Sequence, residues 1–165
     1  MNQKLNSSGV KIIKPSYLLR AKIGTGFLSL KIIERCRRVF DSNTVDFAPM
    51  AMEELDRLEI IIAGAKSKTL TRDEAAGKMT EIIMQLKANA SMFNYPLVSR
   101  LAAIMLGFLE SMKEIDDNAI EIVSAHHKTL KVIIAKKMSG DGGVTGRKLE
   151  EELTYACARY FKSRF

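Results

Sequence analysis

The chain has 165 residues, of which 47% are hydrophobic and 27% are charged, with ten glycines, three prolines and a formal net charge of +7. This length and composition allow one domain with a buried core and exclude a long disordered or low-complexity protein. No apolar run approaches the roughly 20 residues of a membrane-spanning helix, and the start MNQKLNSSG lacks the apolar stretch of a secretory signal, so a cytoplasmic protein without a membrane span is predicted.

The positive charge is concentrated in the first forty residues. These residues contain nine Lys or Arg and one acid, a net +8, whereas the other 125 residues have 17 basic and 18 acidic side chains. Such an asymmetry indicates a contact surface for nucleic acid, anionic lipid or an acidic protein, and a solvated basic tail remains an equal alternative. The predicted basic patch consists of Lys11, Lys14, Arg20, Lys22, Lys31, Arg35 and Arg38.

In chain order, residues 1–25 are predicted to be an irregular basic segment, because Pro15 and the glycine-containing run after it interrupt any pattern. A helical bundle domain is expected over residues 26–165. Its first helix, about 28–40, is amphipathic: Leu28, Ile32, Cys36 and Val39 or Phe40 recur at helical spacing, and basic residues form the outer face.

The next two helices have clear start signals. A helix over about 46–66 tolerates Pro49, because the first turn of a helix has no amide partner to lose. A further helix begins after Thr71, which forms a capping-box pair with Glu74, and ends near Asn94, since Pro96 disfavours helical backbone at the residue before it.

The second half of the chain predicts three more helices. Pro96 opens a helix that is apolar over a wide arc, and another follows over about 116–138. The last helix is expected to begin after Thr145, with Val144 and Leu149 at staple positions. Together these elements predict an all-α, up-and-down bundle of five to six helices.

His126 and His127 form the most suggestive chemical cluster. Adjacent residues on a helix diverge by roughly 100°, and no Asp, Glu or Cys lies four residues from either ring, so one metal ion is poorly placed to bind both. Packed or boundary histidines are the favoured interpretation. The two cysteines, Cys36 and Cys157, form no Cys-x-x-Cys pair. We therefore predict no catalytic residue, no metal and no cofactor.

The stretch EIIMQLKANASMFNYPLVSRLAAIMLGFLE, residues 81–110, resembles the histidine-containing phosphotransfer domains of bacterial phosphorelays, in particular an alphaproteobacterial type. The resemblance is carried by Phe93, Tyr95, Pro96, Leu97 and Val98, with Lys87 at the family's lysine position and His126 at a histidine frequent in its next long helix. It covers about residues 70–135. It implies a four-helix core and a surface that meets receiver domains.

The sequence departs from this family at the phosphoacceptor. The family's histidine falls on Met84, and the glycine after its lysine falls on Ala88. A thioether cannot accept a phosphoryl group, because phosphotransfer needs a nucleophilic ring nitrogen. With Leu86 at the centre of the buried stripe, Met84, Lys87, Ala88 and Ser91 are expected on the outward face.

These observations predict a non-catalytic signalling adaptor that binds a receiver or histidine kinase domain without phosphotransfer. The predicted partner-binding residues are Met84, Gln85, Lys87, Ala88 and Ser91. Two alternatives remain open: binding of nucleic acid or an anionic surface through residues 1–40, and a structural bundle that forms homo-oligomers.

Overall fold

A computed structural model describes residues 17–23, 26, 29–42 and 45–163. These residues form seven helices and no strand. Contacts divide the chain into two units, Met1–Val39 and Phe40–Phe165. The first unit contains α1 (Leu18–Ile23) and most of α2 (Leu30–Asp41). The second unit is a helical bundle, so the predicted all-α bundle is confirmed.

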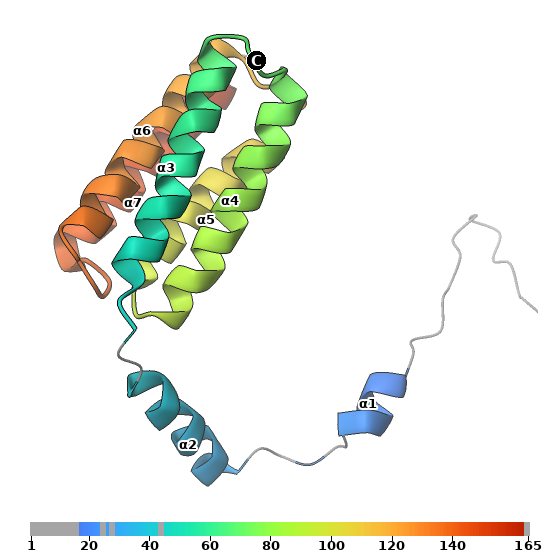
Figure 1. Ribbon diagram of the computed structural model, residues 1–165, viewed down its shortest axis with the longest axis vertical. Helices are drawn as coiled ribbons and strands as arrows, with labels where there is room; N and C mark the ends of the chain where they lie inside the picture. The colour runs from blue at the N-terminus through green and yellow to red at the C-terminus, as the bar shows by residue number, and fades with distance from the viewer. Residues whose placement is uncertain (1–16, 24–25, 27–28, 43–44, 164–165) are drawn as a thin grey trace, which may run out of the picture. The chain divides into compact units, whose positions relative to one another are not determined.

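The bundle contains five helices that alternate in direction (Figure 1): α3 (Phe47–Lys66), α4 (Arg72–Met92), α5 (Pro96–Glu110), α6 (Asp117–Ala135) and α7 (Gly143–Lys162). Around the bundle α3 contacts α4, α4 contacts α5, α5 contacts α6, and α6 contacts α3. The fifth helix, α7, packs on α5 and α6. Short loops between consecutive helices account for this up-and-down arrangement.

Three of these helices begin where the sequence predicts, two of them after capping residues and one at a proline. The Asp46 carboxylate accepts the Ala48 amide ahead of α3. Thr71 and Glu74 form both hydrogen bonds of a capping box at α4, and Pro96 is the first residue of α5. Because caps satisfy amides that have no partner inside the helix, they fix the start of a helix from local sequence alone.

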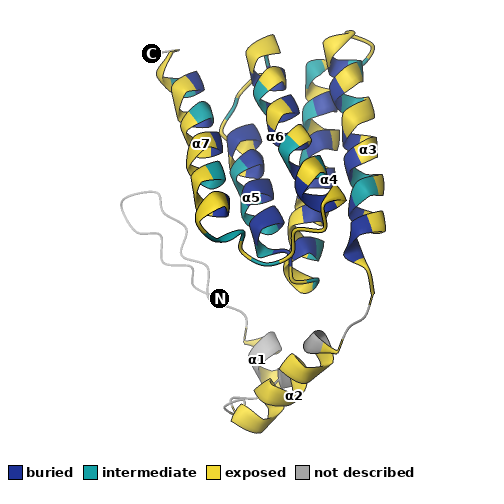
Figure 2. Ribbon diagram, turned by 90° about the vertical axis from the view of Figure 1, so that its left-hand side faces the viewer, coloured by how far each residue is buried: buried dark blue, intermediate teal, exposed yellow. Residues whose placement is uncertain are grey.

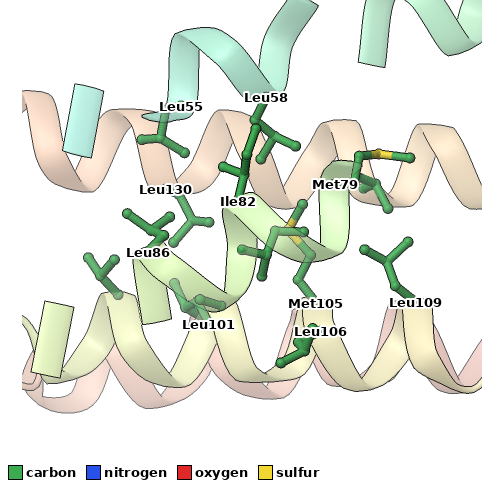
Figure 3. Close-up of a cluster of buried hydrophobic side chains, with 14 of the residues drawn as sticks. Leu55, Leu58, Met79, Ile82, Leu86, Leu101, Met105, Leu106, Leu109 and Leu130 are labelled. Atoms are coloured by element: carbon green, nitrogen blue, oxygen red, sulfur yellow. The ribbon is translucent and has the colours of Figure 1, made fainter. Parts of the chain in front are cut away.

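Each bundle helix turns an apolar face inward, as the alternation of buried and exposed residues along the helices shows (Figure 2). Figure 3 shows the centre of the core, where side chains from α3, α4, α5 and α6 meet. The fully buried members include Leu55, Leu58, Met79, Leu86, Leu101, Met105 and Leu130. A core assembled from four helices holds each of them rigidly against its neighbours.

The start of α7 differs from the prediction. The helix begins at Gly143, not after Thr145, and Val144 is 61% exposed instead of acting as a staple. Gly142 precedes the helix with a φ of 71°, in the left-handed region that favours glycine. The Asp141 side chain accepts the Gly143 amide at 2.9 Å. This local turn chemistry starts the helix three residues before the predicted position.

The N-terminal unit also differs from expectation. The predicted irregular segment 1–25 contains the short helix α1, and the contacts divide the chain after Val39, later than the predicted boundary at residue 26. In α2, the apolar residues Ile32, Cys36 and Val39 are exposed, although their spacing predicted an inward face. Leu28 lies outside the described residues.

Candidate functional site

The five predicted partner-binding residues lie together on one side of α4. Met84 is 54% exposed, and Gln85, Lys87, Ala88 and Ser91 are exposed as well. We call these five residues the α4 face. On the other side of the helix Ile82, Ile83 and Leu86 are buried in the core. The helical spacing of the apolar residues therefore predicted the outward orientation of the face correctly.

A serine on α5 fixes the C-terminal half of this face. The Ser99 hydroxyl donates to the main-chain oxygen of Lys87 at 3.0 Å. The hydroxyl oxygens of Ser91 and Ser99 lie 2.8 Å apart. Since Ser99 uses its only proton on Lys87, Ser91 donates in this pair. These bonds join α4 to α5 at Lys87 and Ser91, so they fix the main chain of α4 at this end of the face.

The α4 face has an apolar centre with polar groups at its border. Its centre is the polarisable thioether of Met84, which adapts to irregular partner surfaces. The amide of Gln85 and the ammonium group of Lys87 border it, and the small Ala88 permits close approach. The hydroxyl of Ser91 donates to the hydroxyl of Ser99.

The two histidines lie in the core, as predicted. His126 is 1% and His127 3% exposed. The Nε2 of His127 donates to the main-chain oxygen of Leu55 on α3 at 2.9 Å, and the Nδ1 of His126 donates to that of Ile122 at 2.9 Å. Burial disfavours the imidazolium and lowers the pKa of both rings. Each ring is therefore a neutral packing group.

Cys157 approaches His126 but does not form a reactive pair with it. The Sγ atom lies 3.9 Å from His126 Nε2. Burial raises the pKa of the Cys157 thiol to about 11, so the thiol stays protonated at neutral pH, whereas the nucleophile of a cysteine enzyme is the thiolate. Within the described residues, no three His, Cys, Asp or Glu side chains are grouped so that they could hold a metal ion.

The predicted basic patch is only partly described. Lys22 on α1 and Lys31, Arg35 and Arg38 on α2 are exposed. Lys11, Lys14 and the side chain of Arg20 lie outside the described residues. The three basic residues of α2 are spaced by four and three positions and therefore form one stripe along that helix.

Two residues beside the α4 face were not predicted. Met92 is exposed, and its spacing of seven and four residues from Gln85 and Ala88 places it on the same side of α4. The helical spacing alone could have identified it. Ser99 supports the face from another helix, so only the packing of α5 on α4 reveals its role.

No protein-family model matches the chain, and neither the curated proteins nor the solved structures compared with it gave a significant match. In the part of the chain that the structure describes, every helix is too short or too polar to cross a lipid bilayer.

Proposed function

We propose that this protein is a non-catalytic adaptor of a bacterial phosphorelay, which binds a receiver or histidine kinase domain in the cytoplasm through the α4 face. The observation that carries the proposal is the exposed Met84 at the centre of that face. It occupies the position at which the resembling phosphotransfer domains have their phosphoacceptor histidine. The bundle would present the docking surface of such a domain without its reactive group.

The composition of the α4 face fits a protein interface. An exposed apolar side chain surrounded by polar groups is the usual arrangement of an interface centre and its rim. The hydrogen bonds from Ser99 to Lys87 and from Ser91 to Ser99 tie the main chain of this part of α4 to α5, so binding would not have to order the backbone of the face. An adaptor of this kind would occupy or scaffold its partner.

Phosphotransfer itself is not proposed. The thioether of Met84 has no nucleophilic nitrogen, and both imidazole rings of the described bundle are buried and bonded to main-chain oxygens. The proposal therefore rests on recognition alone and assigns no enzymatic activity.

Site-specific photo-cross-linking tests the identity of the partner. A photoreactive amino acid at position 84, introduced in cells of the source organism, should cross-link to a protein with a receiver or histidine kinase domain. Position 132 on α6 is the matched control, because Val132 is 52% exposed and Met84 is 54% exposed. The proposal would be contradicted if positions 84 and 132 cross-link to the same protein. It would also be contradicted if position 84 cross-links only to proteins that have no receiver or histidine kinase domain.

A homo-oligomeric bundle is the rival that the same experiment distinguishes. If the α4 face joins two copies of this chain, the cross-linked species at position 84 is a homodimer. Light scattering across a range of protein concentrations then shows the association. A monomer at high concentration removes this rival.

A further inference from the structure

The helix α2 has two chemically distinct sides. At roughly 100° per residue, Ile32, Ile33, Cys36 and Val39 fall within an arc of about 120°. Lys31 and Arg38 lie on the opposite side of the helix. Arg35 and Arg37 lie next to the two edges of the apolar arc. All described side chains of α2 are exposed.

A short helix with an apolar face is stabilised when that face is buried. The helix has only 12 residues, and helices shorter than about 12–15 residues are marginal in water without tertiary contacts. The stability of α2 would therefore increase on a surface that buries Ile32, Ile33 and Val39.

The charges of α2 indicate the chemistry of that surface. The sequence of α2 contains four basic residues, Lys31, Arg35, Arg37 and Arg38, and two acidic ones, Glu34 and Asp41. Residues 1–40 as a whole have a net charge of +8. The surface should therefore be anionic. Nucleic acid would satisfy the arginines but offers an amphipathic helix little apolar area along its phosphate backbone.

An anionic lipid membrane satisfies both sides of the helix at once. An interfacial helix buries its apolar face to a depth of about 5–10 Å, at the boundary of headgroups and acyl chains, while flanking Lys and Arg contact the anionic headgroups. Arginines at the edges of the apolar arc can extend their charged ends toward the headgroups. Arg35 and Arg37 occupy these edge positions.

We propose that α2 is a membrane-surface helix, with Ile32, Ile33, Cys36 and Val39 inserted at the interface of an anionic bilayer and Lys31, Arg35, Arg37 and Arg38 bound to its headgroups. This contact would attach the bundle to a membrane surface without spanning it. The proposal rests on residues of the N-terminal unit and is independent of partner binding at the α4 face.

Co-sedimentation of the full chain with lipid vesicles tests the proposal. The probes are phosphatidylcholine vesicles and vesicles in which about one third of the lipid is phosphatidylglycerol. We expect binding to the anionic vesicles that weakens as salt increases, and little binding to the neutral ones. Ile32→Gln and Ile33→Gln should each lower the partition coefficient about tenfold, and Arg35→Gln and Arg38→Gln about fivefold each.

Ile60→Gln is the matched control, because Ile60 is a 71% exposed isoleucine on α3 of the bundle. It should leave vesicle binding unchanged. The side chains of Ile32, Ile33, Arg35, Arg38 and Ile60 are all exposed, and none of them is packed in the core. Each variant should therefore unfold at the same denaturant concentration as the parent protein.

A second readout uses the two cysteines. Cys36 is exposed on the apolar face of α2 and Cys157 is buried, so a polarity-sensitive fluorophore can be attached selectively at Cys36. Its emission should shift to shorter wavelength with anionic vesicles. The proposal is overturned if the chain does not bind anionic vesicles, or if the isoleucine variants bind as well as the parent. Binding of a short DNA duplex that depends on the arginines but not on the isoleucines, without vesicle binding, would likewise overturn it.

Discussion

At the scale of single residues, the adjacent histidines show how burial determines protonation. His126 and His127 donate to main-chain oxygens of Ile122 and Leu55, and burial keeps both rings neutral. In the unfolded chain the same rings have a pKa of about 6.5. As the pH falls below that value, the unfolded state takes up protons that the folded state does not. The stability of the bundle must then decrease.

The first prediction is a loss of stability between about pH 6.5 and pH 5. The free energy of unfolding should fall by at most about 1.4 kcal/mol per pH unit for each histidine. The carboxyl groups of Asp46, Glu59 and Glu74 have a pKa below their usual range, mainly because each accepts a side-chain hydrogen bond. Their contribution is lost at lower pH. Urea unfolding at several pH values measures the effect.

A double variant isolates the histidine contribution. His126→Gln with His127→Gln removes both titrating rings, so the dependence of the free energy of unfolding on pH should become markedly shallower in this window. The slope is the readout, because the substitutions also alter packing at every pH. An unchanged slope would show that other groups cause the pH dependence.

The second prediction concerns two methionines of α4. Met84 is exposed and Met79 is fully buried, so Met84→Asp should change the free energy of unfolding by no more than about 0.5 kcal/mol. Met79→Ala should lower it by about 2–5 kcal/mol, since it leaves a cavity in the core. Chemical denaturation measures both. A large loss in Met84→Asp would mean that the α4 face is packed and not free to bind.

At the scale of elements, local sequence was sufficient to predict some helix boundaries and not others. Thr71 with Glu74 and Pro96 act through the first turn of their own helices, so their effect is readable from sequence. The start of α7 depends in addition on neighbours distant in sequence. Arg100 on α5 donates to the main-chain oxygen of Asp141, and the Leu97 amide donates to that of Gly140.

The third prediction uses two glycines in helices. A Cβ atom at Gly146 of α7 would lie 2.5 Å from the main-chain oxygen of Asp141, whereas one at Gly107 of α5 would meet no atom within 4 Å. Gly146→Ala should therefore lower the free energy of unfolding by about 1–3 kcal/mol. Gly107→Ala should raise it by about 0.5–1 kcal/mol, because alanine loses less backbone entropy in a helix.

Thermal or urea unfolding of the two variants provides the comparison, and each serves as the control for the other. Equal effects would contradict the close approach of α7 to the loop that precedes it. A gain in stability at Gly146 would show that the chain relieves the contact by a small shift.

Helix α2 shows a limit of sequence-based prediction at the same scale. Its spacing of Ile32, Cys36 and Val39 correctly predicted an amphipathic helix, and the structure shows that these side chains are exposed. Periodicity identifies an apolar face but does not identify what covers it. The covering surface depends on tertiary contacts or on a binding partner.

At the scale of the whole molecule, the sequence predicted the all-α bundle and the outward orientation of the α4 face. Both follow from the helical repeat of apolar residues such as Ile82, Ile83 and Leu86. The sequence alone could not predict that Ser99 on α5 bonds to the α4 face, because that contact depends on how the two helices pack. The spacing of apolar residues also could not predict that the contacts divide the chain after Val39.

Binding of a receiver or kinase domain to the α4 face is the central claim. The most direct measurement is the affinity of the receiver or kinase domain that cross-links at position 84 for three proteins: the parent chain, Met84→Asp and Val132→Asp. The central claim predicts at least about thirtyfold weaker binding for Met84→Asp, a loss of about 2 kcal/mol or more, because the substitution buries an unpaired charge in the interface. Val132→Asp should bind as the parent does. Equal affinity of Met84→Asp and the parent chain would contradict the claim that the α4 face is the docking surface.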